Sequence, residues 1–124
     1  MAVITPTITQ IPTINGFTHV VAWTPMANGD TGLPWQGAAS ADRSIEITGT
    51  FGVGGSVSIQ GSNAVTSPAA GGTWSALSDA QGGALAVTAT KVETVAEFTN
   101  WIRPAVTAGD GTTSLTVAML AKGS

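Results

Sequence analysis

Apolar and polar residues alternate along much of this chain with a repeat of two. The alternation is clearest in residues 44–51, where isoleucine and phenylalanine alternate with serine, threonine and glutamate, and it recurs in residues 56–62. Successive side chains of a β-strand point to opposite faces, so this pattern indicates strands with one buried and one wet face. The glycine-rich stretch 52–55 lies between the two segments, and we predict that they form a hairpin.

Other short strand candidates, each bounded by turn residues, occur at 17–24, 74–77, 85–89 and 115–119. We expect residues 92–98 and 101–107 to form a further pair of strands, with Pro104 placing the second at a sheet edge or at a bulge. No helical periodicity competes with this pattern. About seven or eight short strands predict an all-β fold, either an antiparallel β-sandwich or a barrel-like arrangement, and we favour the sandwich.

The N-terminal segment differs from the rest because it combines isoleucine with proline. Pro6 and Pro12 remove two amide donors and exclude a helix, while the isoleucines favour extended structure. We therefore divide the chain into an extended N-terminal arm, residues 1–16, and a single β-sandwich domain, residues 17–124. The arm supplies most of the candidate protein-interface residues, namely Ile4, Ile8, Ile11 and Ile14.

The composition points to protein partners rather than to substrates. The 124 residues include 4 basic and 7 acidic side chains, one histidine and no cysteine, and only 9% are charged, against about 25% in an average soluble domain. Hydrophobic residues make up 43% of the chain, which argues against intrinsic disorder. A lone monomer of this composition would expose much apolar surface, so we expect a homo-oligomer, for example a trimer.

The charge distribution and the length of the apolar runs indicate which classes of partner are not expected. The four basic residues are scattered, whereas nucleic-acid binding needs clustered cations, so no nucleic-acid partner is expected. No apolar run reaches the roughly 18 residues of a membrane helix, so no membrane partner is expected. No basic residue precedes Arg43, so we expect no secretion signal and synthesis in the cytoplasm.

Few side chains could carry out chemistry. We interpret His19, the only histidine, as a half-buried strand residue, because a general base would need a carboxylate partner and an open pocket. Glu46 facing Glu93 or Glu97 could form a glycosidase pair, but glutamates that keep a sheet face soluble are the simpler explanation. No acidic run has the spacing of a calcium loop. The sequence therefore predicts no enzyme, no metal site and no cofactor.

Four tryptophans, Trp23, Trp35, Trp74 and Trp101, occur in a chain that has no tyrosine. Large aromatic residues fill cores, and exposed ones anchor interfaces or stack on sugar rings. We expect two or more of the four to lie in the core. Trp35 is the interface candidate, because its loop has no other apolar residue of that size. Trp101 and Arg103 should share a strand face, which would allow a cation–π contact.

Three stretches resemble small virion proteins of tailed bacteriophages that decorate or cement the capsid: ADRSIEITGTFGVGGSVSIQGSN at 41–63, WSALSDAQG at 74–82 and WIRPAVTAGDGTTSLTV at 101–117. The resemblance covers roughly residues 40–120. It implies a virion structural protein on the capsid surface, synthesised in the host cytoplasm, with the major capsid protein as its partner.

On this hypothesis the arm lies extended across a neighbouring subunit or the major capsid protein. Such arms bind through backbone pairing and apolar pockets, and many copies on a lattice strengthen weak contacts. Two alternatives stay open. The chain is also similar to discoidin-like sugar-binding sandwiches in its Gly-Ser, Trp and Arg scheme, which would make it a carbohydrate-binding module on a virion surface. A tail or baseplate subunit is the third possibility.

Overall fold

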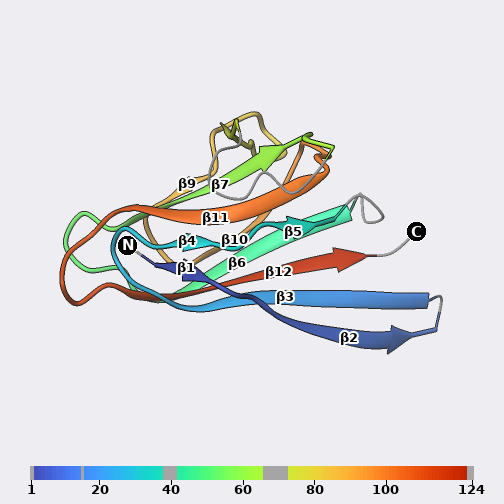
Figure 1. Ribbon diagram of the computed structural model, residues 1–124, viewed down its shortest axis with the longest axis horizontal. Coiled ribbons are helices and arrows are strands. Elements are labelled where there is room, and N and C mark those ends of the chain that lie inside the picture. Colours follow the sequence, from blue (N-terminus) through green and yellow to red (C-terminus); the bar gives the residue numbers. More distant parts are fainter. Residues whose placement is uncertain (1, 15, 38–41, 66–72, 123–124) are drawn as a thin grey trace.

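The protein is an all-β sandwich of two sheets that pack face to face (Figure 1). Its computed structural model describes residues 2–14, 16–37, 42–65 and 73–122. Sheet A contains β1 (Val3–Ile4), β4 (Thr31–Gly32), β5 (Trp35–Gln36), β7 (Ser56–Ser62), β8 (Ser75–Ala76), β9 (Ala86–Val87) and β11 (Trp101–Ala108). Sheet B contains β2 (Thr7–Thr13), β3 (Gly16–Met26), β6 (Asp42–Thr50), β10 (Lys91–Thr94) and β12 (Ser114–Lys122). The predicted fold class is confirmed.

Sequence neighbours lie in the same sheet in some cases, such as β2 with β3, and in different sheets in others, such as β6 and β7. Sheet A runs β1-β4-β11-β7-β8, with β5 also beside β11 and β9 beside β7, and sheet B runs β10-β6-β12-β3-β2. All pairs are antiparallel except β1 with β4, which is parallel. Strands β12 and β3 therefore lie inside sheet B, while β10 and β2 form its two edges.

The inner faces of the two sheets form one core. Alternate residues of β3, β6 and β12 are buried there, as the period of two predicts, and they meet inward residues of β7 and β11. Trp23 is the largest wholly buried side chain, and its indole Nε1 donates a hydrogen bond to the Leu33 carbonyl at 3.0 Å. The backbone passes close to this ring at Gly32, where a Cβ atom would overlap Trp23 and Pro104.

The predicted hairpin of residues 44–51 and 56–62 is wrong. Strand β6 pairs with β10 and β12 in sheet B, whereas β7 pairs with β11, β8 and β9 in sheet A. The glycine-rich stretch between them is thus an arch that crosses from one sheet to the other. Alternation identifies which face of a strand is buried, but it does not identify the neighbouring strand.

The arch is held by the turn that precedes β12. Gly52 has a φ of 75°, and a Cβ atom there would overlap the Asp110 carboxylate. One oxygen of that carboxylate accepts the Thr112 hydroxyl at 2.7 Å and the Thr112 amide at 2.9 Å, and the other accepts the Val53 amide at 2.9 Å. The Thr112 hydroxyl, followed by the Val53 and Thr112 amides, lowers the pKa of Asp110 to about 2, because all three stabilise the ionised form.

We predict that Asp110→Asn lowers the Tm at neutral pH and that this effect fades in acid. The folded-state pKa of about 2 lies below the unfolded value of about 3.9. The carboxylate therefore stabilises the fold above about pH 4, and this contribution is lost as the pH falls towards 2. Thermal melts of both proteins between about pH 6 and pH 2 measure the Tm difference. A difference that stays constant over this range would contradict the assignment.

The second predicted strand pair is also wrong. Strand β10 pairs with β6 in sheet B, and β11 pairs with β7 in sheet A. Pro104 does not mark an edge, because β11 has neighbours on both sides. The proline is accommodated where β4 has ended at Gly32 and β5 has not yet begun at Trp35. A bulge does occur in β11, but between Val106 and Ala108.

The segment expected to be a separate arm is extended, but it is built into both sheets. Strand β1 pairs with β4 in sheet A, and β2 pairs with β3 in sheet B, so the chain crosses between the sheets at Thr5 and Pro6. Asp30 fixes its beginning, because its buried carboxylate accepts the amides of Ala2 and Ala27, each at 2.9 Å. In this structure the N-terminal segment therefore forms two edge strands of its own domain rather than a free arm.

Candidate protein-interaction surface

Three of the four predicted arm isoleucines are exposed on the β2–β3 hairpin. Ile8 and Ile11 lie on β2 and are 50% and 42% exposed, and Ile14 follows β2 with its side chain wholly exposed. Ile4 differs, because it is half-buried and packs against the core. The hairpin extends beyond the ends of β7 and β11, so its tip projects from the sandwich (Figure 1). The structure therefore gathers Ile8, Ile11 and Ile14 on one protruding element.

The free edge of β2 offers little backbone pairing. The hairpin closes at the pair Thr13 and Gly16, and hydrogen-bonded pairs alternate along an antiparallel ladder. The even-numbered residues of β2 therefore turn their backbone groups away from β3. Pro12 is one of them and lacks an amide, so only Ile8 and Gln10 present donors at this edge. Proline at an edge strand limits the addition of further strands, so contacts made here depend mainly on side chains.

A second apolar surface covers the outer face of sheet B, which faces away from the core. Leu120 and Val92 are 46% and 61% exposed there, and the half-buried Val20 and Ala118 lie on the same face. Two shallow hollows of about 260 and 310 Å³ flank Leu120. This surface was not predicted from the sequence. Its signal was Leu120, an apolar residue at an outward position of a strand whose inward positions are also apolar.

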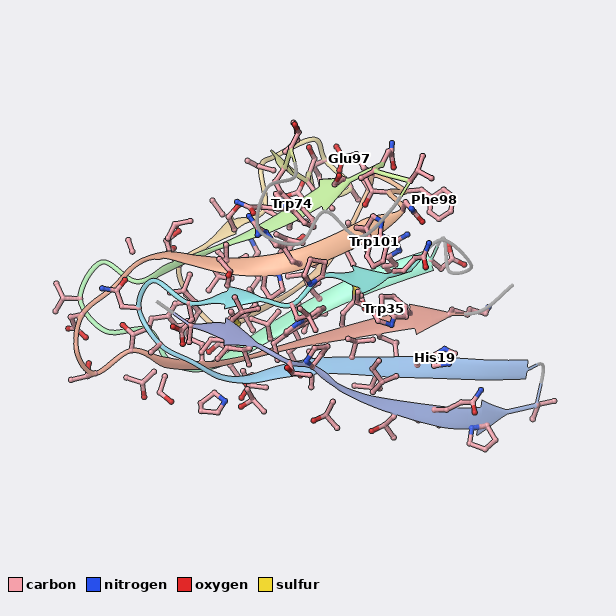
Figure 2. The ribbon with its side chains drawn as sticks, viewed as in Figure 1. His19, Trp35, Trp74, Glu97, Phe98 and Trp101 are labelled. Carbon is pink, nitrogen blue, oxygen red and sulfur yellow. The ribbon has the colours of Figure 1, made fainter. Side chains whose placement is uncertain are left out.

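Trp35, the remaining interface candidate, is not an exposed anchor. It lies on β5, inside the stretch read as a loop, and its half-buried ring packs against the core. Its ring centroid is 6.5 Å from that of His19, and Figure 2 shows both residues at the end of the sandwich towards which β2 and β12 run. His19 is half-buried on its strand, as the sequence analysis interpreted it. Of the four tryptophans, only Trp23 lies wholly in the core.

The other two tryptophans lie over the outer face of sheet A (Figure 2). The Arg103 guanidinium lies 4.2 Å from the centroid of the Trp74 ring, and its Nε donates to the Gln60 side chain at 3.0 Å. Burial lowers the pKa of Arg103. Trp101 shares the outward face of β11 with Arg103, but the cation–π partner is Trp74. The Trp101 indole donates to the Ala64 carbonyl at 3.0 Å.

Glu46 and Glu93, one of the two candidate glutamate pairs, do not face each other. Glu46 lies opposite Val92 on the outer face of sheet B, while Glu93 lies opposite the buried Ile45 and forms an ion pair with Lys91 at 3.0 Å. Adjacent strand positions point to opposite faces, so Glu46 and Glu93 diverge. Glu97 accepts the Ser78 amide at 2.6 Å, and this bond is the main cause of its lowered pKa. Among the residues that the structure describes, no group of three or more metal-ligating side chains occurs.

The described residues also contain no helix long and apolar enough to cross a membrane. This chain matches no protein-family model, no curated protein and no solved structure at a significant level.

Proposed function

We propose that this protein is a virion structural protein that binds the outside of a phage capsid as a decoration or cement protein, with the major capsid protein as its partner. The virion assignment rests on the sequence resemblance of residues 40–120. The observation that carries the binding mechanism is the protruding β2–β3 hairpin, which exposes Ile11 on the outer face of sheet B, Ile8 on the opposite face and the fully exposed Ile14 after the strand. The hairpin takes the role that the sequence analysis gave to a free arm.

The hairpin suits binding through side chains. Burying a fully exposed isoleucine such as Ile14 in a partner's pocket contributes roughly 1.5–3 kcal/mol, and the half-exposed Ile11 contributes about half as much. The strands behind them are fixed by pairing with the rest of sheet B, which reduces the ordering cost of binding. Repetition over a capsid lattice would strengthen the contact further.

Point substitutions test this better than a truncation, because removing residues 2–14 would delete two strands. We expect Ile11→Thr and Ile14→Ser each to weaken binding to purified capsids that lack this protein by about tenfold, measured by co-sedimentation. Val53→Ser is the matched control, because Val53 is 82% exposed on the arch, away from the hairpin. Unchanged binding by an Ile11→Thr/Ile14→Ser double variant would exclude the hairpin. Wild-type protein that binds no capsids would exclude the decoration function itself.

The carbohydrate-binding alternative has one supporting observation. Trp74, Trp101 and Arg103 gather on the outer face of sheet A beside Asn63 and Asn100, and aromatic and amide side chains together suit sugar rings and hydroxyls. Binding to an array of neutral glycans that is lost in Trp101→Ala but retained in Ile14→Ser would favour it. Immunogold labelling at the tail rather than the head would favour a tail or baseplate subunit.

A further inference from the structure

We infer that the outer face of sheet B packs against the same face of a second copy of this chain, about a two-fold axis that runs along the groove between β6 and β12. This inference does not rest on the proposed function. Ile11 of the hairpin lies on the same outer face, in line with Thr18, Lys122 and Asp42, but a two-fold axis between β6 and β12 leaves β2 beside the contact rather than inside it. It commits to a dimer, whereas composition predicts only that some oligomer forms. The charges and the shape of the face support it, and the size of the face limits the strength of the contact.

The charges at one end of the face complement each other. On the described strands of sheet B, the charged residues that point outward are Asp42, Glu46 and Lys122. Asp42 and Lys122 lie directly opposite each other across β6 and β12. A two-fold axis between these strands exchanges the two positions. Asp42 of one copy then faces Lys122 of the other, and the reverse contact forms with it. The same operation places Glu46 over Ala118 of the second copy, so the two Glu46 carboxylates lie near the axis without an outward cation of the described strands beside them and weaken the contact.

The shape is complementary under the same symmetry. Ser44 and Leu120 are also directly opposite each other in the ladder, and both hollows on this face are lined by this pair. The axis that exchanges Asp42 with Lys122 also exchanges Ser44 with Leu120. Each Leu120 therefore projects onto Ser44 of the other copy, into the depression that the two hollows form around this small residue. Exposed apolar side chains seated in such depressions are typical of interface cores.

The size of the face limits the contact to a weak dimer. A two-fold axis between β6 and β12 overlaps β10, β6, β12 and β3 of the two copies and leaves β2 outside the overlap. Strands lie about 4.8 Å apart and rise about 3.3 Å per residue, so four strands over about seven residues cover at most roughly 440 Å². Two copies would bury roughly 900 Å² in total, which is in the range of weak, transient interfaces. The remaining outward residues on this face are small or uncharged, mainly threonine, serine, valine and alanine.

Charge reversal tests this geometry. At neutral pH and about 100 μM, the wild-type chain should sediment with twice the 12.3 kDa mass of one copy. Asp42→Lys places lysine opposite lysine, and Lys122→Asp places aspartate opposite aspartate, so each variant alone should be monomeric. The double variant Asp42→Lys/Lys122→Asp should dimerise again. Lys91→Asp makes the same charge change outside this face and should remain dimeric.

Mixing the two single variants separates a contact between copies from the pairing within one copy. A chain with two lysines and a chain with two aspartates complement each other, so an equimolar mixture should form a heterodimer. Dimerisation on mixing also shows that both variants are folded. The inference is overturned if the wild-type chain is monomeric under these conditions, if either single variant still dimerises, or if the mixture stays monomeric.

Discussion

Trp23→Ala should lower the free energy of unfolding by about 3–5 kcal/mol, the largest effect of any single substitution considered for this chain. The Trp23 side chain is 1% exposed and lies at the centre of the core between β3 and the close backbone approach at Gly32. Truncation removes a large buried apolar surface and leaves a cavity that the surrounding sheets can close only in part. A domain of this size has only about 5–15 kcal/mol of stability in total, so the variant should be close to unfolding.

A second variant separates packing from hydrogen bonding at this position. Trp23→Phe keeps an aromatic ring but removes the Nε1 donor to the Leu33 carbonyl, and we expect a smaller loss of about 1–3 kcal/mol. Urea unfolding followed by far-UV circular dichroism measures both losses. Val53→Ala is the control, because an 82% exposed valine should change stability by no more than about 0.5 kcal/mol. A Trp23→Ala variant within about 1 kcal/mol of wild type would mean that this ring is not central to the core.

The alternating pattern predicted the faces of the strands but not their partners. Ile45 and Ile47 point into the core as the pattern requires, yet β6 and β7 lie in different sheets. The deciding contacts are non-local: the carboxylate of Asp110 holds the Val53 amide, 57 residues away in the chain. A glycine-rich stretch fits a hairpin turn and an arch between sheets equally well, and the local sequence does not distinguish the two.

The interaction surfaces were predicted only in part. The exposure of Ile11 and Ile14 could be anticipated, because the prolines of this segment exclude a helix and keep the isoleucines in an extended chain. Leu120 was overlooked, although the alternation that turns Leu115, Val117 and Met119 inward places it at an outward position. Trp35 was placed on a loop by its glycine and proline neighbours, although β5 pairs it with β11.

Arg43 is the opposite of Leu120, because it is a charged residue at an inward position of its strand. Two residues before Ile45 on β6, it shares the core face of that strand, and it is 3% exposed. Its Nη2 donates to the carbonyls of Gly37 at 2.9 Å and Thr99 at 2.8 Å, and its guanidinium lies 5.2 Å from the Phe98 ring centroid. Burial lowers the pKa of Arg43. Through these bonds one side chain of sheet B fixes the segments that flank β5 and β11 in sheet A.

Arg43→Leu should therefore lower the free energy of unfolding by about 3 kcal/mol. The leucine restores apolar volume, but it leaves the Gly37 and Thr99 carbonyls without this donor, and an unsatisfied buried carbonyl costs about 1–3 kcal/mol. Arg43→Lys keeps the charge and loses the planar fork that reaches both carbonyls, so its loss should be intermediate. Lys122→Leu, measured at a concentration low enough to keep the chain monomeric, is the matched control because it removes an exposed cation from the same sheet. Equal stability of the wild-type and Arg43→Leu proteins in urea would show that the two sheets do not depend on this contact.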